Sequence, residues 1–195
     1  HSFPTRRSSD LNTLKLLNHF EISKPLISYH RHNEEIKVDN LIEKLEEGKN
    51  IALVSDAGTP VISDPGEIIV KEAIKKEIEI IPIPGACAAI NGLIASGLDS
   101  KEFVFIGFLP LNKKLRKEKL EQIQNENKTT ILYEAPHKLL NTLKDLSEIL
   151  NDRKIVIARE LTKIHEEFIR GTVEEVLQKY IEPKGEHIII IEGNS

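Results

Sequence analysis

The sequence predicts an α/β protein built from two halves, and three observations support this class. Short apolar runs alternate along the chain with segments whose apolar residues recur at helical spacing. The run over residues 51–54 is continuous rather than alternating, which is typical of a parallel-sheet strand covered by helices on both faces. Several runs end in turns of small or polar residues, the place where α/β proteins bind small molecules. We expect one α/β domain at 11–109 and another at 113–195.

Helix start and stop signals locate the helices of the first half. Asn33 is expected to cap a helix that Gly48 ends. Asp64 is expected to cap the next helix, with Glu67 as its capping-box partner. The expected elements of this half are helices at 11–20, 33–47 and 68–76 and strands at 25–29, 51–54, 79–83 and 103–108.

The second half repeats the α/β pattern. Leucines recur on one stripe over residues 139–150, which predicts an amphipathic helix. Thr172 and Glu175 form a predicted capping box at the start of a later helix. The expected elements are strands at 129–133, 154–158, 166–170 and 187–192 and helices at 138–150 and 172–179.

Composition limits the class of protein. The chain has 195 residues, 39% of them hydrophobic and 30% charged, with a formal net charge of −4, which argues against a generally basic nucleic-acid-binding protein. No apolar run approaches the roughly 20 residues of a membrane helix. A single cysteine, Cys87, excludes an intrachain disulfide and a cysteine-based metal site, so we expect a reducing, cytoplasmic setting. Residues 1–10 lack both apolar periodicity and the core of a signal peptide, which predicts a foreign or disordered leader.

Two local clusters each allow two interpretations. His30 and His32 could point to one side of a strand and bind a metal, but no third ligand is evident nearby, so polar loop residues are favoured. Lys113, Lys114 and Arg116 lie in a basic segment at the domain junction. Such a segment is either a solvated helix face or a surface that contacts RNA phosphates.

Polar residues that end strands occur in both halves, which suggests a ligand held between two domains. The sequence has no P-loop, G-x-G-x-x-G, G-x-S-x-G or metal-ligand spacing, which disfavours ATP hydrolysis, simple dinucleotide binding, serine hydrolysis and zinc chemistry. The small residues at 84–90 leave backbone N–H groups accessible to a ligand at a helix start, or they simply allow close helix–sheet packing.

Several segments taken together, in order, have a recognisable pattern. They are Ser55-Asp56-Ala57-Gly58-Thr59-Pro60, Asp64-Pro65-Gly66, Pro84-Gly85-Ala86-Cys87-Ala88-Ala89-Ile90, Gly107-Phe108-Leu109-Pro110, Tyr133-Glu134-Ala135-Pro136-His137 and Ala158-Arg159-Glu160-Leu161-Thr162-Lys163. This set resembles the tetrapyrrole methylase superfamily and, within it, the branch that methylates a cytidine ribose 2′-hydroxyl in small-subunit ribosomal RNA. The resemblance implies a parallel-rich N-terminal sheet, a mixed-sheet C-terminal domain, S-adenosyl-L-methionine between them, and a homodimer.

The resemblance also implies residue roles. Cofactor contacts would come from Asp56, Gly58, Thr59, Pro60, Cys87, Ala88, Tyr133, Glu134, Leu161, Thr162 and Gly171. The RNA substrate would meet His30, His32, Asn33, Lys113, Lys114, Arg116 and Arg159. Candidate bases for the hydroxyl proton are Glu134, Glu160, Lys163 and His137. Arg159 and Glu160 could instead form a structural ion pair.

The chain departs from the family pattern at its start. That pattern begins with a strand, a Pro-rich loop that ends Gly-Asn-Leu and lines the cofactor site, and a later Glu-Asp-Thr-Arg segment; none of these precedes Leu11. We therefore expect an N-terminally truncated chain with a half-built cofactor loop. Two alternatives to an RNA methyltransferase stay open: methylation of a porphyrinoid precursor, and a non-catalytic folded remnant.

Overall fold

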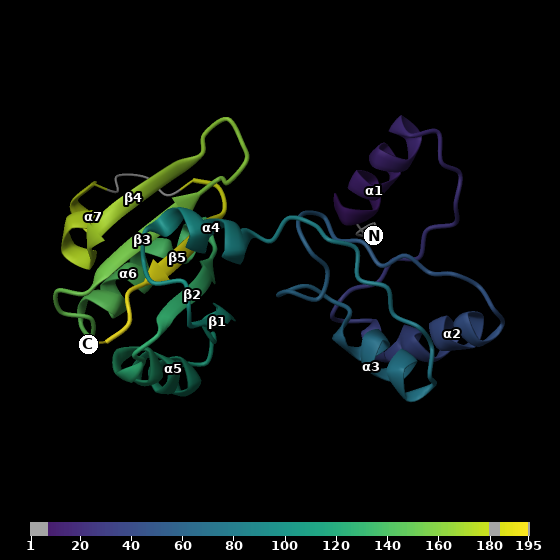
Figure 1. Ribbon diagram of the computed structural model, residues 1–195, viewed down its shortest axis with the longest axis horizontal. Coiled ribbons are helices and arrows are strands. Elements are labelled where there is room, and N and C mark those ends of the chain that lie inside the picture. The colour runs from purple at the N-terminus through teal and green to yellow at the C-terminus, as the bar shows by residue number, and fades with distance from the viewer. Residues whose placement is uncertain (1–7, 180–183, 195) are drawn as a thin grey trace, which may run out of the picture. The chain divides into compact units, whose positions relative to one another are not determined.

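The computed structural model describes residues 8–179 and 184–194, and the chain divides into two compact units, His1–Cys87 and Ala88–Ser195 (Figure 1). This division lies earlier along the chain than the boundary expected at residues 109–113. The first unit contains α1 (Ser8–His19), α2 (Glu34–Glu46) and α3 (Glu67–Lys75). The second contains α4 (Ala88–Ser96), β1 (Phe103–Phe108), α5 (Lys113–Asn125), β2 (Thr129–Glu134), α6 (Pro136–Ser147), β3 (Lys154–Arg159), β4 (Glu167–Thr172), α7 (Val173–Lys179) and β5 (His187–Ile191).

The second unit is built on a five-stranded mixed sheet with the order β1-β2-β5-β3-β4. Only the β1–β2 pair is parallel; β5 inserts antiparallel between β2 and β3, and β4 pairs antiparallel with β3. The mixed sheet and the α/β class are therefore confirmed. The register of β1 shifts between Phe105 and Gly107, where Gly107 has a φ of 72°. Glycine adopts this left-handed backbone without a Cβ clash, so the strand can bulge there.

Side chains of β5 alternate between the two faces of this sheet. Ile189 and Ile191 join the cluster that contains the buried residues of α6 and α7. Ile188 and Ile190 lie against Gly92 of α4, where a Cβ would meet both side chains at 3.4 Å. Helices α6 and α7 therefore cover one face and α4 packs on the other (Figure 1).

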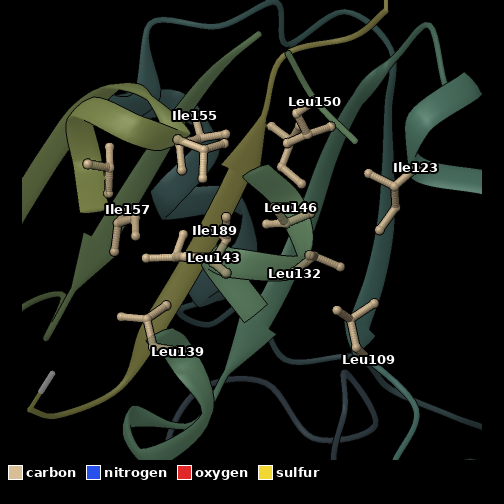
Figure 2. Packing of buried hydrophobic residues seen from close by; sticks show 13 residues of the cluster. Leu109, Ile123, Leu132, Leu139, Leu143, Leu146, Leu150, Ile155, Ile157 and Ile189 are labelled. Atoms are coloured by element: carbon tan, nitrogen blue, oxygen red, sulfur yellow. The ribbon is translucent and has the colours of Figure 1, made fainter. Parts of the chain in front are cut away.

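The main core lies between the sheet and α6, as Figure 2 shows. Leu139, Leu143 and Leu146 point from one stripe of α6 onto the strands, and none of the three exposes any surface. Leu150, just beyond the helix, is equally buried. The leucine stripe predicted from the sequence is thus confirmed, because spacing at 3.6 residues per turn puts these residues on one face.

The first unit has a smaller core in which α2 and α3 pack through Val38, Leu41, Ile69 and other apolar residues. The strands expected at 25–29, 51–54 and 79–83 are wrong for the described residues, which assign no strand there. An apolar run indicates that a segment is buried, but it does not specify a neighbouring strand. A strand needs such a neighbour, because its backbone N–H and C=O groups must form hydrogen bonds with it.

Because no strand is assigned in these apolar runs, several apolar side chains of the first unit are exposed. Val54 is 55% exposed, Ile81 68% and Ile83 79%, although all three lie in runs that a parallel sheet would bury. The parallel-rich N-terminal sheet is therefore not formed by the residues that the structure describes here. A leader is expected at residues 1–10. Residues 1–7 of it lie outside the described residues, and the remainder, from Ser8, begins α1.

The start of α3 differs from its prediction. Gly66, not Asp64, precedes the first helical residue, Glu67, so the predicted capping box is wrong. The carboxylate of Glu34 instead accepts a hydrogen bond from the Gly66 N–H at 2.7 Å. Gly66 has a φ of 136°, and a Cβ there would lie 2.5 Å from Leu53 Cδ2. This contact ties the first turn of α2 to the first turn of α3.

Two other caps were predicted and have different outcomes. Asn33 is at the N-cap position of α2, but its side chain accepts from the His30 N–H at 2.7 Å instead of capping the helix. The Thr172–Glu175 capping box is confirmed, because each side chain accepts a hydrogen bond from the backbone N–H of the other, at 2.9 and 3.3 Å.

Candidate functional site

Two loops of the first unit that carry predicted cofactor residues lie side by side. The Thr59 hydroxyl donates to the carbonyl oxygen of Ala86 at 3.0 Å. Gly58 has a φ of 78°, and a Cβ there would lie 3.3 Å from the same oxygen. Ser55 fixes the turn by donating its hydroxyl to the Gly58 carbonyl at 2.9 Å. The structure thus brings Gly58 and Thr59 next to the segment that ends in Cys87, a half-buried free thiol.

The remaining part of this loop carries charge and backbone strain. Asp56 is exposed and accepts a long hydrogen bond from the Asn12 amide at 3.5 Å. Burial raises the pKa of the Asp64 carboxyl, Arg31 acts against that rise, and Asp56 adds to it. Val61, one residue after Pro60, has a φ of 74°, which is a true outlier for a β-branched side chain. Strain of this kind concentrates at functional loops.

The histidine segment is a loop held by local contacts. His30 and His32 face each other edge-on with ring centroids 6.2 Å apart. Asn33 holds the loop together, since its amide nitrogen donates to the Ser28 carbonyl at 3.2 Å and lies 3.0 Å from His30 Nε2. Among the described residues, no group of three His, Cys, Asp or Glu side chains is placed to hold a metal ion.

In the second unit, sheet register aligns four polar residues from four adjacent strands. Glu134 pairs with His187, His187 with Arg159, and Arg159 with Glu167. Paired residues of antiparallel strands project to the same face. The row therefore lies at one end of the face that α6 and α7 cover. His187 was not selected from the sequence, because its position beside Glu134 depends on pairing between distant strands.

Glu134 and Arg116 belong to one partly buried network. Glu134 is 4% exposed; one of its oxygens accepts from the Ala135 N–H at 2.9 Å and the other from the Thr142 hydroxyl at 2.5 Å. Arg116 donates to Thr142 Oγ1 at 2.9 Å and to Asp145 Oδ2 at 2.8 Å. This network joins β2, α5 and α6, so it gives both predicted site residues a structural role.

Two candidate bases, Glu160 and Lys163, form an ion pair with each other. Lys163 Nζ lies 3.0 Å from a Glu160 oxygen and 3.0 Å from Glu186. The Glu186 backbone N–H and Lys163 lower the pKa of Glu160, and Glu160 with Glu186 raises the pKa of Lys163. Both groups are therefore kept charged. Arg159 pairs with Glu167 at 3.3 Å and donates to the Lys184 carbonyl at 2.8 Å, so its ion-pair partner is Glu167 and not Glu160.

The loop after β3 is conformationally strained. Glu160 and Thr162 have φ angles of 48° and 67°. A Glu166 carboxylate oxygen holds the turn by accepting from the Thr162 N–H at 2.7 Å. Leu161, between the two strained residues, is half-buried. The structure therefore presents the predicted cofactor residues Leu161 and Thr162 on a tight, internally bonded turn.

Tyr133 and Gly171 have clear local roles. The Tyr133 hydroxyl accepts from the Ala89 N–H at 3.0 Å, so it contacts the first turn of α4, where Ala88 lies. Gly171 has a φ of 154°, and a Cβ there would lie 2.4 Å from a carboxylate oxygen of Glu175. The absence of a side chain at Gly171 therefore makes room for the carboxylate that caps α7.

Exposed basic residues occupy the first turn of α5 and the first turn of α6. Lys113 and Lys114 begin α5, where Asn112 caps by accepting from the Lys114 and Leu115 N–H groups. Cations are unfavourable at a helix N-terminus. His137 lies on the first turn of α6. Within the described part of the chain, these three side chains are exposed and form no hydrogen bond or ion pair.

Three comparisons place this chain among known proteins. Residues 5–177 match the family model described as Tetrapyrrole (Corrin/Porphyrin) Methylases. The chain is 54% identical over 184 residues to Ribosomal RNA small subunit methyltransferase I of Halalkalibacterium halodurans, which covers 93% of this chain and 64% of that protein. It is 50% identical to the Bacillus subtilis protein of the same name, over 94% of this chain and 63% of that protein. The chain thus spans less than two thirds of the length of these relatives.

Solved structures of low identity show the same fold. A diphthine synthase superposes with a TM-score of 0.65 at 16% identity, covering 93% of this chain and 74% of that one. Uroporphyrin-III C-methyltransferase from Thermus thermophilus, complexed with S-adenosyl homocysteine, gives a TM-score of 0.58 at 15% identity, covering 88% and 78%. No helix in the described part of the chain is both long and apolar enough to cross a membrane.

Proposed function

Because this chain belongs to the tetrapyrrole (corrin/porphyrin) methylase family, we propose that it is part of an S-adenosylmethionine-dependent methyltransferase that modifies a cytidine ribose 2′-hydroxyl in small-subunit ribosomal RNA. The 54% identity to a relative named for small-subunit ribosomal RNA supports this substrate. Likeness to porphyrin methylases at 15% identity supports the fold alone, so a porphyrinoid substrate has no comparable support.

The loops of the first unit fit such a cofactor by their chemistry. Residues 55–60 and 84–87 are small or exposed, and the Thr59–Ala86 hydrogen bond holds the loops together. We propose that Asp56, Gly58, Pro60 and the Cys87 segment bind the ligand there, as polar groups and accessible backbone allow. When bound, S-adenosylmethionine supplies an electrophilic methyl group. Ala88, Tyr133, Leu161 and Thr162 remain predicted contacts of the second unit.

Among the four candidate bases, we propose that His137 takes the proton of the ribose hydroxyl. Both Glu134 oxygens accept internal hydrogen bonds, and Glu160 and Lys163 pair with each other. The His137 imidazole is exposed and has a nitrogen that can accept a proton. Lys113 and Lys114 lie at the N-terminus of α5, where cations do not stabilise a helix. We propose that they bind RNA phosphates instead.

The first test measures methyl transfer directly. The purified chain is incubated with methyl-labelled S-adenosylmethionine and either small ribosomal subunits or a porphyrinoid precursor. We expect label in 2′-O-methylcytidine after nuclease digestion and none in the porphyrinoid. Label in the porphyrinoid alone would replace the proposed substrate. No transfer to either, together with no cofactor binding by calorimetry, would favour a non-catalytic remnant. Sedimentation of the same sample tests the homodimer that the family resemblance implies.

A second test addresses the base. His137→Ala is expected to reduce the rate of methyl transfer by about 10²-fold, because general base catalysis contributes on this scale. The dissociation constant of S-adenosylmethionine should stay unchanged. His165→Ala is the matched control, since His165 is also an exposed histidine without a hydrogen bond to the described residues, and its rate should be that of the unaltered chain. Equal rates for both variants would exclude His137 as the base.

A further inference from the structure

Helix α4 is held by hydrogen bonds at both of its ends. At its C-terminal end, Arg170 of β4 donates from Nη2 to the Ala95 carbonyl at 2.6 Å and from Nε to the Ser96 carbonyl at 3.3 Å. At its N-terminal end, the Ala89 N–H donates to the Tyr133 hydroxyl at 3.0 Å. Helix-terminal carbonyls and N–H groups lack partners within the helix, so these contacts satisfy them.

The middle of α4 sits closely on the sheet. Gly92 is buried, and a Cβ at that position would meet Ile188 and Ile190 at 3.4 Å. A larger residue would therefore push the helix away from the sheet unless the isoleucines moved. With both ends bonded and the centre in contact, α4 has little freedom to slide or tilt on β2, β3 and β5, which it contacts.

The side chain of Arg170 is also restrained by a contact within its own strand. Its guanidinium carbon lies 5.1 Å from the centroid of the Phe168 ring, two residues earlier on the same strand. Such a cation–π contact restricts a side chain that otherwise samples many rotamers. The charge also suits the place, because cations are favourable at the C-terminal end of a helix. This arginine is thus a preorganised C-terminal cap and not an unrestrained surface charge.

We propose that Arg170 is a positioning residue for the cofactor site. It holds α4 by the carbonyls of its last turn, and α4 carries Ala88 of the predicted cofactor segment on its first turn. In this arrangement, loss of the cap lets the first turn shift relative to Tyr133 and weakens cofactor binding without removing any cofactor contact. The inference rests on the proposed function, since it needs S-adenosylmethionine to bind at this segment.

The chain offers a matched control for this proposal. Arg153 also caps the end of a helix of the second unit: it donates to the Ile123 and Gln124 carbonyls of the last turn of α5, at 3.0 and 3.2 Å. It further donates from Nε to the Glu192 carbonyl at 2.8 Å. Arg153→Ala therefore removes the same kind of cap from a helix that carries no predicted cofactor contact, and it reports on destabilisation alone.

The experiment compares Arg170→Ala, Arg170→Lys and Arg153→Ala in the full chain. We measure the dissociation constant of S-adenosylmethionine by calorimetry and the amide hydrogen exchange of residues 88–96 in α4 and 113–125 in α5. Arg170→Ala should raise the dissociation constant roughly tenfold, a typical coupling between separate sites, and speed exchange in α4. Arg170→Lys, which keeps the charge and can reach one carbonyl, should give intermediate values. Arg153→Ala should speed exchange in α5. It should leave the dissociation constant and the exchange of α4 unchanged.

Two results would overturn the proposal. One is equal cofactor affinity in Arg170→Ala and the unaltered chain; the other is an equal loss of affinity in Arg170→Ala and Arg153→Ala, which would reduce Arg170 to a general stabiliser. If the unaltered chain binds no S-adenosylmethionine, the proposed function fails for this chain. Hydrogen exchange then tests the structural part of the proposal separately. Faster exchange of α4 in Arg170→Ala, but not in Arg153→Ala, supports the role of Arg170 in holding α4. Unchanged exchange of α4 overturns that role.

Discussion

Replacing Glu134 with alanine is expected to lower the free energy of unfolding by about 2 kcal/mol, the usual cost of leaving buried hydrogen-bond donors without an acceptor. The carboxylate is 4% exposed and accepts from the Thr142 hydroxyl and the Ala135 N–H. Without it, both donors lose their acceptor at the start of α6. The loss spreads to Arg116, because Thr142 also accepts from that guanidinium.

The matched control is Glu148→Ala. Glu148 follows the other end of α6, is exposed, and forms no side-chain hydrogen bond or ion pair with the described residues. Urea unfolding of the two variants, followed by far-ultraviolet circular dichroism, gives the difference in midpoint. If Glu134→Ala unfolds at the same urea concentration as Glu148→Ala, the network contributes nothing measurable, and Glu134 becomes available again as a candidate base.

The network also shows what a sequence can and cannot predict about a site. Glu134 belongs to the Tyr133–His137 motif at the end of β2, and Arg116 belongs to the basic segment on α5. Neither the motif nor the segment contains Thr142, whose hydroxyl connects them. That connection depends on how α5 and α6 pack together, which local periodicity does not encode.

The elements of the second unit were largely predictable because each has its own strong local signal. Leucines at helical spacing marked α6, and apolar β-branched runs marked β3 and β5. Strand order was not predictable, since β5, the last strand of the chain, inserts between β2 and β3. This insertion is what places His187 beside both Glu134 and Arg159.

The first unit shows the opposite balance. Its helices α2 and α3 were predicted from patterns contained within each helix. Its expected strands are not found among the described residues, because a strand depends on neighbours that the same local pattern does not specify. The cap of α3 failed for a related reason: the group that bonds Gly66 is Glu34, which lies far earlier in the chain and joins it only after folding.

His187 should make folding stability depend on pH in a defined window. Burial is the main cause that lowers the pKa of this imidazole from 6.5 to about 4; the positive charge of Arg159 adds to it, and Glu160 and the Gly185 backbone act against it. The unfolded chain therefore binds more protons than the folded chain between these values. The stabilisation is fully present above pH 6.5 and is lost as the pH falls toward 4.

The full loss should be about 3 kcal/mol, given 1.36 kcal/mol for each unit of pKa difference. His187→Gln keeps a neutral polar side chain of similar size in the row, so the pH dependence that His187 contributes should disappear in this variant. Urea unfolding at intervals from pH 4 to 7.5 measures it. His165→Gln changes an exposed histidine and should leave the curve unaltered. An equal slope in His187→Gln and the unaltered chain would mean that carboxylates alone cause the loss, and that His187 can be protonated within its row.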